Sequence, residues 1–575
     1  MNNNKYFTYY FMLSFGILNM ISLMLVFSAF TFLSKLSLSW WHFPLSVCSS
    51  IYINYIAIKY YYNIEYKSVF YKTTAIMLIL VLLSIILGAS VYDNSWDGQE
   101  YHQETIIQLK EGWNPFYSRL NSNIPYYYLL NHYGKGAEIP QATIYAFINK
   151  IQAGKATNIL LLLASYFLSA YVLSGIKKLS TFKIHLFSSL FALNPISTNQ
   201  ILTYYIDGQV GSLLCCLLIV SYLLSNGYDK YKLLLFGSII ILLVNIKFTC
   251  IPFTGLFVIG LLVALYYKNK ELLKKVFIVA LFSSIIGICF VGYNPYITNT
   301  INHNNPFFPL TGKDKIDIMT DNSPKEFIDK NRFEKFAISI ISRPENILKI
   351  TNRSPVIKIP LKLSKEDILN SIGVDQRISG FGFLFEEIVL LAIGIFCGIL
   401  FLTWEEFGRC LAYTVGVLLL SVFIISEAWW ARYVPQLWFV CLIIFMAAEL
   451  SKYNMIRKFG WLSVILMIIN SYFIMALTFI YSVKDTVNIN YQLAQIKMCK
   501  EPIKVNFGAF NSVRMRLIEQ DIKYIEEKFP IDNDAVLFEG SCGGAFMKFS
   551  DTPENLPKPF IMKLGYKIKE LHILN

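Results

Sequence analysis

Charged residues are scarce in this chain of 575 residues: they make up 15% of it, whereas hydrophobic residues make up 55%. A soluble globular domain carries about 25% charged residues. The mean hydropathy is correspondingly high, at +0.48. Many apolar residues fall in runs of about 17 to 25, the length that crosses a bilayer as a helix. The composition therefore excludes an ordinary soluble protein and predicts an all-α polytopic membrane protein.

Other absences narrow the class further. No pair among the ten cysteines has the spacing of metal ligands. Lys5 precedes a long apolar run without a clear small-residue cleavage site, so the first helix is expected to remain in the protein. The formal net charge is +13. In a soluble protein this excess could indicate nucleic acid. In a membrane protein it reflects the lysines of cytoplasmic loops, so no nucleic-acid partner is expected.

The apolar runs predict about thirteen transmembrane helices. One run is interrupted by Asn194-Pro195, and two runs are joined tightly around Lys247. Five basic clusters, at 67–72, 177–183, 230–232, 268–275 and 452–458, fall on one side if the N-terminus is cytoplasmic. We therefore expect a multi-pass protein of the cell inner (plasma) membrane with an extracytoplasmic C-terminus. The predicted spans are 9–33, 44–60, 73–91, 157–176, 184–203, 209–226, 232–246, 249–267, 275–292, 383–403, 409–427, 434–450 and 460–482.

The extracytoplasmic side then receives two long loops, 92–156 and 293–382, and the C-terminal tail. These features divide the chain into a transmembrane domain, 1–482, and a small extracytoplasmic α+β domain, 483–575. The short apolar run within 534–539 predicts a strand in the second domain, in which no pattern indicates catalysis. Cys499 and Cys542 are the only cysteines clearly on this side, so they are candidates for a disulfide.

The segment 92–117 begins where an apolar run stops, and it predicts a helix over about 96–111. Isoleucines and a leucine give this helix one apolar side, while Gln99 and Gln103 are expected to keep another side wet. Glu100 and Glu104 are expected on a solvated face. Such a helix would lie on the membrane surface rather than cross it.

Two acids at the start of this segment, Asp93 and Asp97, are the leading catalytic candidates. Either could act as a general base, or as a ligand of a divalent metal, for a substrate at the membrane boundary. The alternative is a helix cap with no chemical role. Asp97 is the favoured acid of the two. Tyr101 follows it by one helical turn and His102 comes next, and either could orient an acceptor.

Three further residues at predicted outer helix ends are candidates for substrate binding. Asp207 could share a cavity with Asp97, although a plain loop acid is an equal alternative. Arg432 lies between aromatic residues, where its guanidinium could hold a phosphate or could simply anchor the helix at the membrane surface. Lys247, between two apolar runs, is a second candidate cation.

These residues resemble the GT-C superfamily of integral-membrane glycosyltransferases. The resemblance rests on an acid in the first large outer loop followed by a surface helix, with Asp97, Tyr101 and His102 spaced as in bacterial members. The Asn-Pro-Phe-Phe-Pro of 305–309 and the Trp-Trp-Ala-Arg-Tyr of 429–433 are similar to elements of such proteins as well. The chain departs from many relatives in lacking their Asp-Glu pair.

The resemblance implies a GT-C-like fold and an inverting sugar transfer from a polyprenyl-phosphate carrier on the extracytoplasmic face. The acceptor would be an envelope glycan, a lipid or a protein, and membrane lipid would surround the enzyme. No cofactor is certain; a divalent metal is one option. The richness in Lys, Ile, Asn and Tyr indicates an AT-rich bacterial genome, which favours undecaprenyl phosphate as the carrier.

Two other functions are consistent with the same sequence. A polymerase or ligase that uses diphosphate-linked oligosaccharides would share the predicted topology. A lipid-linked glycan transporter or flippase is the alternative outside enzymes, but transporters place ionisable residues and broken helices near the bilayer midplane. Here the ionisable residues inside predicted spans, Glu386 and Glu387 among them, lie near the ends of those spans. The sequence therefore favours an enzyme.

Overall fold

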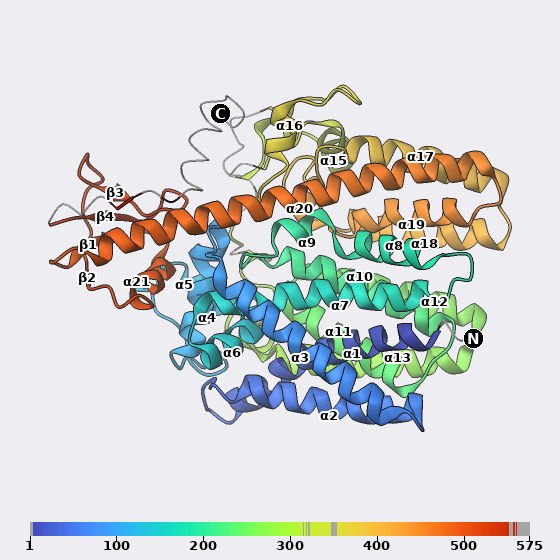
Figure 1. Ribbon diagram of the computed structural model, residues 1–575, viewed down its shortest axis with the longest axis horizontal. Coiled ribbons are helices and arrows are strands. Elements are labelled where there is room, and N and C mark those ends of the chain that lie inside the picture. The colour runs from blue at the N-terminus through green and yellow to red at the C-terminus, as the bar shows by residue number, and fades with distance from the viewer. Residues whose placement is uncertain are drawn as a thin grey trace.

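A computed structural model describes residues 4–313, 315–317, 319, 322–346, 354–550, 556, 557 and 559. Most of these residues form a bundle of long helices that run side by side along the longest axis of the molecule (Figure 1). The bundle helices are α1 (Asn4–Leu33), α2 (His42–Tyr62), α3 (Tyr66–Ser90), α7 (Ala156–Leu173), α8 (Thr181–Ala192), α9 (Pro195–Asn199), α10 (Asp207–Ser225), α11 (Lys230–Ile246), α12 (Cys250–Lys268), α13 (Lys270–Ile285), α17 (Phe385–Leu402), α18 (Glu406–Phe423), α19 (Leu437–Leu450) and α20 (Asn454–Lys497).

Within the described residues, nine helical segments are long and apolar enough to cross a membrane. Together they indicate a multi-pass membrane protein. Every one of the thirteen predicted spans falls on a helix, but the count of thirteen is not confirmed, because α2, α8–α9, α11 and α19 are too short or too polar to be among the nine. The nine are Phe7–Leu33, Tyr66–Ser90, Ile151–Leu173, Asp207–Ser225, Cys250–Lys268, Lys270–Val291, Phe385–Leu402, Glu406–Phe423 and Asn454–Lys497.

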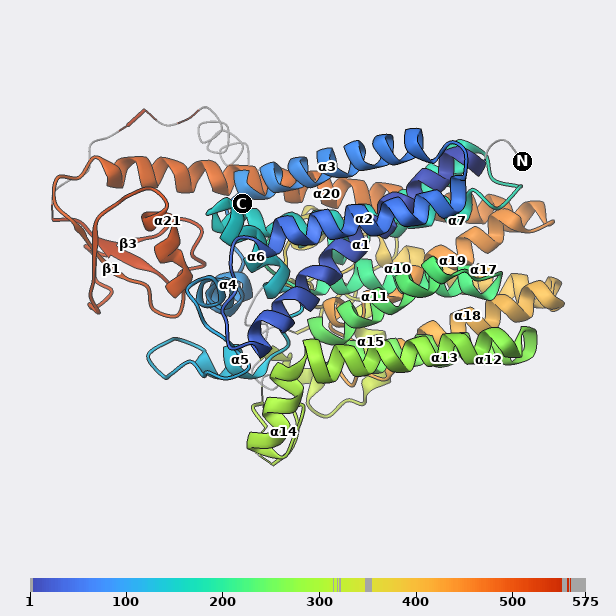
Figure 2. The ribbon, with the colours of Figure 1, turned by 90° about the horizontal axis from the view of Figure 1, so that it is seen from below.

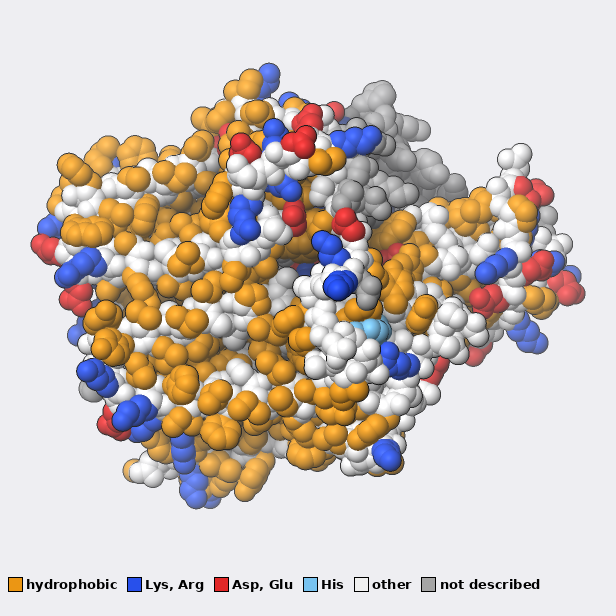
Figure 3. Space-filling view, turned by 180° about the vertical axis from the view of Figure 1, so that it is seen from behind, with side chains coloured by type: hydrophobic (Ala, Val, Ile, Leu, Met, Phe, Trp, Pro, Cys, Tyr) orange, Lys and Arg blue, Asp and Glu red, His pale blue; other side chains and the backbone are white. Residues whose placement is uncertain are grey.

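The surface of the bundle has the chemistry that lipid contact requires. Hydrophobic side chains cover most of the helical face in Figure 3, and lysines and arginines reappear at the end farthest from the C-terminal domain. The N-terminus lies at that same end in Figures 1 and 2. This distribution is the one that the positive-inside rule produces when the N-terminal end is cytoplasmic.

Two irregularities predicted from the sequence are present in the bundle. The helical run is interrupted at Asn194-Pro195. There the Asn194 side chain accepts a hydrogen bond from the Ile196 backbone N–H (3.0 Å), and Pro195 is the first residue of α9. The junction between α11 and α12 contains Lys247, whose extended backbone ends the first helix. Both interruptions lie at the same end of the bundle as the long loops, so both place polar groups at that end.

The two long loops between bundle helices are largely helical. The first contains η1 (Gly98–His102), α4 (Gln103–Lys110), α5 (Tyr127–His132), α6 (Glu138–Ile148) and η2 (Ile151–Lys155). The described part of the second contains η4 (Tyr293–Ile297), α14 (Thr298–His303), η6 (Lys325–Phe327), α15 (Arg332–Ile341) and α16 (Lys365–Asn370), and it follows η3 (Ile286–Val291). A short helix, η8 (Ala431–Tyr433), joins α18 to α19. These elements cap one end of the bundle (Figure 2).

The C-terminal domain is built on a four-stranded sheet of order β2-β1-β4-β3. Strands β1 (Ile503–Asn506) and β2 (Tyr524–Glu526) are parallel, and β4 (Phe546–Lys548) pairs antiparallel with both β1 and β3 (Val536–Leu537). The short helices η9 (Asn511–Val513) and α21 (Arg514–Ile518) lie between β1 and β2. The strand predicted within 534–539 is thus confirmed as β3.

Helix α20 connects this domain to the bundle without a break. It is 44 residues long, and the predicted domain boundary at 482 lies inside it. Its last turns carry Ile489, Leu493 and Ile496 into the core of the C-terminal domain, where they pack with Tyr92 from the first loop. The two cysteines of this region do not form a disulfide: Cys499, just beyond the end of α20, donates to the Gln495 carbonyl oxygen (3.8 Å), and Cys542 donates to the Asn94 carbonyl oxygen (2.9 Å).

Candidate active site

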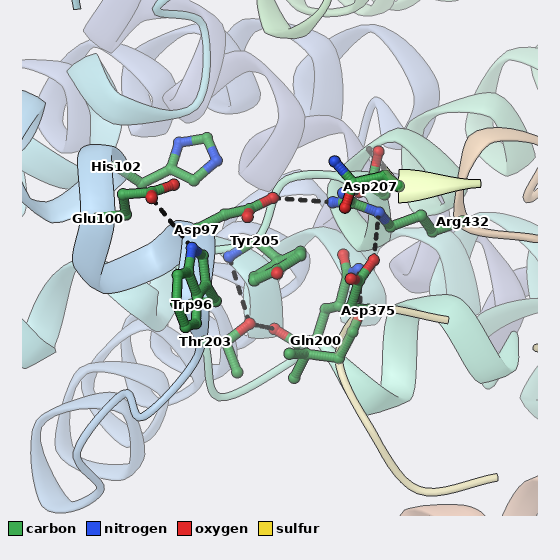
Figure 4. Close-up of polar contacts among 12 residues, drawn as sticks. Trp96, Asp97, Glu100, His102, Gln200, Thr203, Tyr205, Asp207, Asp375 and Arg432 are labelled. Carbon is green, nitrogen blue, oxygen red and sulfur yellow. Dashed lines mark hydrogen bonds and ion pairs between the residues drawn. The ribbon is translucent and has the colours of Figure 1, made fainter. Parts of the chain in front are cut away.

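Arg432 is the centre of an ion cluster at the loop end of the bundle (Figure 4). Its Nη1 donates to Asp97 Oδ2 at 3.0 Å and to Asp207 Oδ2 at 3.2 Å. Its Nε lies 2.9 Å from Asp375 Oδ1. The three carboxylates come from the first loop, the start of α10 and the second loop, so Arg432 joins segments that are distant in the sequence.

The backbone and the neighbouring rings fix the position of Arg432. Its backbone N–H donates to the Gln376 carbonyl (3.0 Å), which ties η8 to the second loop. The guanidinium carbon lies 5.0 Å from the ring centres of both Tyr205 and Trp430. Burial disfavours the charged guanidinium, but the carboxylates of Asp375 and Asp97 outweigh this effect and raise the pKa of Arg432 above its ordinary value. Arg432 is therefore cationic at any physiological pH.

Lys247 adds a second cation to the cluster. Its Nζ lies 2.5 Å from Asp207 Oδ1 and 4.2 Å from the centre of the Tyr433 ring. Asp207 is the first residue of α10, so the positive end of that helix also favours its charge. The side chain of Lys247 remains 24% exposed. A ligand at the surface can therefore reach Lys247 but not the deeply buried Asp207.

Asp375, which was not predicted from the sequence, lies in the second loop and adds a third carboxylate to the cluster. Arg377 binds it through Nε (2.8 Å) and Nη2 (2.7 Å), and Arg377 in turn donates to the backbone and side-chain oxygens of Asn322 (both 2.9 Å). The signal that could have found this pair is its position: Asp375 and Arg377 precede a predicted span, just as Asp97 follows one.

Tyr101 lies next to the cluster as its spacing from Asp97 predicts. Burial, followed by the charge of Asp97, raises the pKa of Tyr101 well above its ordinary value, so its hydroxyl stays protonated. Five of the seven candidates from the sequence, namely Asp97, Tyr101, Asp207, Lys247 and Arg432, are thus brought together.

Asp93 lies outside the cluster although it is only one helical turn from Asp97. It is fully buried, and its carboxylate accepts from the backbone N–H groups of Ser95 (2.9 Å) and Tyr204 (3.0 Å). Burial raises its pKa. A side chain at Gly98 would collide with this carboxylate, which explains the glycine after Asp97. These contacts assign Asp93 to holding the first loop against the chain that precedes α10.

His102 also points away from Arg432. Its Nδ1 lies 2.6 Å from Glu138 Oε1, and both side chains are buried. The structure corrects the expectation that this helix has a solvated face, because Gln99, Gln103, Glu100 and Glu104 are all buried. The C-terminal domain covers two of them: Arg514 pairs with Glu104 through two nitrogens, and Ser512 donates to the Gln99 carbonyl (2.7 Å).

A cavity of about 410 Å³ opens beside the cluster. Tyr205 and Asp375, which both contact Arg432, form part of its wall. Much of the rest of the wall comes from the start of the first loop, the 369–375 segment and the 478–485 part of α20, and Asn199, Thr203, Asn346 and Cys542 complete it. The volume lies in the range of small-molecule sites. The ion cluster is therefore accessible to a ligand.

The described residues do not fit a divalent metal. Among them, no group of three or more His, Cys, Asp or Glu side chains is arranged to hold one. The carboxylates of Asp97, Asp207 and Asp375 are already neutralised by Arg432, Lys247 and Arg377.

Comparison with known proteins adds no assignment. No family model matches the chain, and no curated protein and no solved structure matches it.

Proposed function

We propose that this protein is a membrane glycosyltransferase that takes a sugar from a polyprenyl-phosphate carrier and transfers it to an acceptor hydroxyl on the extracytoplasmic face. One observation carries the proposal: Asp97, an acid with 16% of its side chain exposed, is held by Arg432 beside Lys247 and a cavity at one end of an apolar bundle. At this end of the bundle, the acid suits an acceptor hydroxyl, and the two cations suit the phosphate of a lipid donor.

In the proposed reaction, Asp97 accepts the proton of the acceptor hydroxyl as that oxygen attacks the anomeric carbon. The bond between this carbon and the phosphate oxygen breaks, and its electron pair leaves with the phosphate. Attack from the side opposite the leaving group inverts the configuration. The ion pair with Arg432 Nη1 (3.0 Å) holds the Asp97 side chain in place for this step.

The cations of the cluster suit the departing phosphate. Within the described part of the chain, the hydrogen bonds of Arg432 to carboxylates come from Nη1, Nε lies 2.9 Å from Asp375 Oδ1, and Nη2 donates no hydrogen bond. This nitrogen and the part-exposed ammonium of Lys247 can donate to phosphate oxygens without displacing Asp97. Negative charge grows on the phosphate as the bond breaks, so both cations stabilise the transition state more than the bound donor.

The test uses the full chain, purified and placed in lipid nanodiscs. Undecaprenyl-phosphate sugars of several kinds are supplied with an envelope-glycan extract, and the release of free undecaprenyl phosphate is measured. We expect release with at least one monophosphate donor and its loss in Asp97→Asn. Turnover only with diphosphate-linked oligosaccharides would replace this proposal with a polymerase or ligase. No turnover, combined with movement of intact lipid-linked glycan across the bilayer, would replace it with a flippase.

The proposal also requires the loop end to face outward, with the N-terminus in the cytoplasm of a plasma-membrane protein. In intact cells carrying a cysteine-free background, Lys325→Cys should react with an impermeant thiol reagent. Lys177→Cys, at the opposite end of the bundle, should react only after the membrane is permeabilised. The reverse pattern would place the site in the cytoplasm and exclude the proposed donor.

A further inference from the structure

The cavity beside the ion cluster contains polar groups that the protein itself leaves unsatisfied. Asn346 Nδ2 is buried and has no hydrogen-bond partner within the described residues. The Tyr205 hydroxyl is buried as well; the backbone N–H of Asp97 lies near its oxygen, but its own proton has no acceptor among the described groups. A buried polar group without a partner costs about 1 to 3 kcal/mol. Both residues line the cavity, so small side-chain rotations would let a ligand with several hydrogen-bonding groups satisfy these atoms.

The electrostatics of the cavity select against anions. The described residues that line it include two carboxylates, Asp375 and Asp485, and no lysine, arginine or histidine. Asp375 is paired with Arg432 and Arg377, whereas the Asp485 carboxylate accepts a hydrogen bond from the neutral Asn94 side chain. An acidic ligand would lie beside an unneutralised carboxylate in a partly dry site, where like charges repel strongly. A neutral ligand meets no such penalty.

Aromatic rings complete the wall. Trp96 and Tyr481 line the cavity together with Tyr205. The Trp96 ring is fixed in place, because its Nε1 donates to Glu100 Oε1 (3.0 Å) and its centre lies 4.9 Å from the centre of the Phe510 ring in a T-shaped arrangement. A fixed ring offers an apolar face at little entropic cost. Rings combined with amide and hydroxyl groups match a ligand that has both C–H faces and hydroxyl edges, which is the chemistry of a pyranose sugar.

We propose that this cavity binds a glycosyl unit that carries free hydroxyls and no anionic group, and that this unit belongs to the acceptor. The assignment to the acceptor rests on the proposed function, since Lys247, a cation for the donor phosphate, does not line the cavity. Tyr205 and Asp375 belong both to the cavity wall and to the surroundings of Arg432, so a bound sugar lies next to the cluster that holds Asp97. The Tyr205 hydroxyl donates to the sugar, and Asn346 donates through its amide.

The test is calorimetric titration of the full chain in nanodiscs, without lipid donor, using maltose and chitobiose as neutral probes and digalacturonate as the acidic probe. We expect at least one neutral disaccharide to bind and digalacturonate to bind at least tenfold more weakly than that disaccharide. Tyr205→Phe should weaken the neutral probe about 3- to 10-fold, because one hydrogen bond is worth about 0.5 to 1.5 kcal/mol. Asp485→Asn should reduce the difference in affinity between the neutral disaccharide and digalacturonate.

The adjacent tyrosine provides a matched control. The Tyr204 hydroxyl donates to the Ile151 carbonyl oxygen and does not line the cavity. Tyr204→Phe should therefore lower the melting temperature and leave sugar affinity unchanged. Tyr205→Phe should weaken sugar binding and leave the melting temperature unchanged. The proposal is overturned if digalacturonate binds as well as the neutral probes, if neither neutral probe binds, or if Tyr205→Phe and Asn346→Leu both leave affinity unchanged.

This result is separable from the proposed function. Sugar binding with the expected selectivity, together with no release of undecaprenyl phosphate from any donor, would keep the cavity and remove the transferase. Turnover that depends on Asp97, without neutral-sugar binding, would keep the transferase and remove this cavity as its acceptor site.

Discussion

Asp93 and Asp97 lie four residues apart in one short segment, and the structure gives them opposite surroundings. Asp93 is completely buried and accepts only from protein donors, two of which are backbone N–H groups. Asp97 retains solvent exposure and meets a guanidinium beside a cavity. The first carboxylate has its hydrogen bonds satisfied by the fold, while the second still has room for a ligand.

The difference shows that position in the sequence is a poor guide to the role of a boundary acid. Both acids follow the same apolar run, and both could cap the same helix. The two acids differ in the segment that contacts each of them. The chain preceding α10 contacts Asp93, and η8 contacts Asp97. Chemistry requires access as well as charge, and here only tertiary contacts decide access.

The sharpest test of this comparison is the pair Asp97→Asn and Asp93→Asn. Asp97→Asn keeps the shape and removes the basicity, so transfer should fall by about 10² to 10⁴ while donor affinity changes little. Asp93→Asn places an amide donor against backbone N–H groups and should lower the free energy of unfolding by about 1 to 3 kcal/mol. The rate per folded molecule should then remain close to wild type. Melting curves and single-turnover rates measured on the same preparations separate the two effects.

The opposite outcome would exchange the two roles. If Asp93→Asn abolishes transfer at full stability and Asp97→Asn does not, Asp93 is the reacting acid. If both variants keep wild-type transfer at equal abundance, neither acid takes part in the reaction.

Removal of Arg432 should have the next largest effect. Arg432→Met leaves three carboxylates with one cation fewer, and breaking a buried ion pair in this way costs about 3 to 5 kcal/mol. We expect a large loss of thermal stability and of donor binding. Arg432→Lys should recover part of the stability but not the forked contacts. Arg409→Met, at an exposed arginine elsewhere, is the control and should change neither quantity.

A third acid in the same segment, Glu100, sharpens the comparison through pH. Burial is the main cause that raises its pKa from 4.5 to about 7. The folded protein therefore holds a proton that the unfolded chain has released, so the stabilising effect is full below pH 4.5 and is lost as pH rises toward 7. Glu100→Gln should remove up to about 3 kcal/mol of this pH dependence, and the corresponding melting temperatures measure it. An unchanged slope between pH 5 and pH 7 would show that another group carries the dependence.

The smallest expected effect concerns how the C-terminal domain holds the Asp93 side of the segment. Arg516 is buried, and it donates to the Asp93 carbonyl (3.1 Å), to Gln99 Oε1 (3.0 Å) and to the Glu539 carbonyl (2.7 Å). Arg516→Lys keeps the charge but cannot reach three acceptors, so stability should fall by about 2 kcal/mol. Hydrogen exchange should rise in the segment 92–99. Lys504→Met, which removes an exposed ion pair in the same domain, should have little effect; equal losses in both variants would contradict a specific role for Arg516.

The sequence by itself determined the helical bundle and several of its details. Apolar runs of bilayer length must bury or cover their backbone as helices, so the spans could be located, as could the break at Asn194-Pro195 and the junction at Lys247. Acids and cations at the ends of such runs are costly unless they have a purpose. This reasoning found Asp97, Asp207, Lys247 and Arg432 before their positions were known.

Tertiary structure alone decided how these ends meet. Asp375 joins the cluster from more than 250 residues beyond Asp97, a distance along the chain over which no periodicity or motif acts. The predicted span ends at 482, but α20 is 44 residues long, continues to Lys497 and leads into the sheet of the C-terminal domain, which packs on the first loop and buries Glu104 against Arg514. Burial depends on which segments come to cover a side chain, and that is settled only when distant parts of the chain pack together.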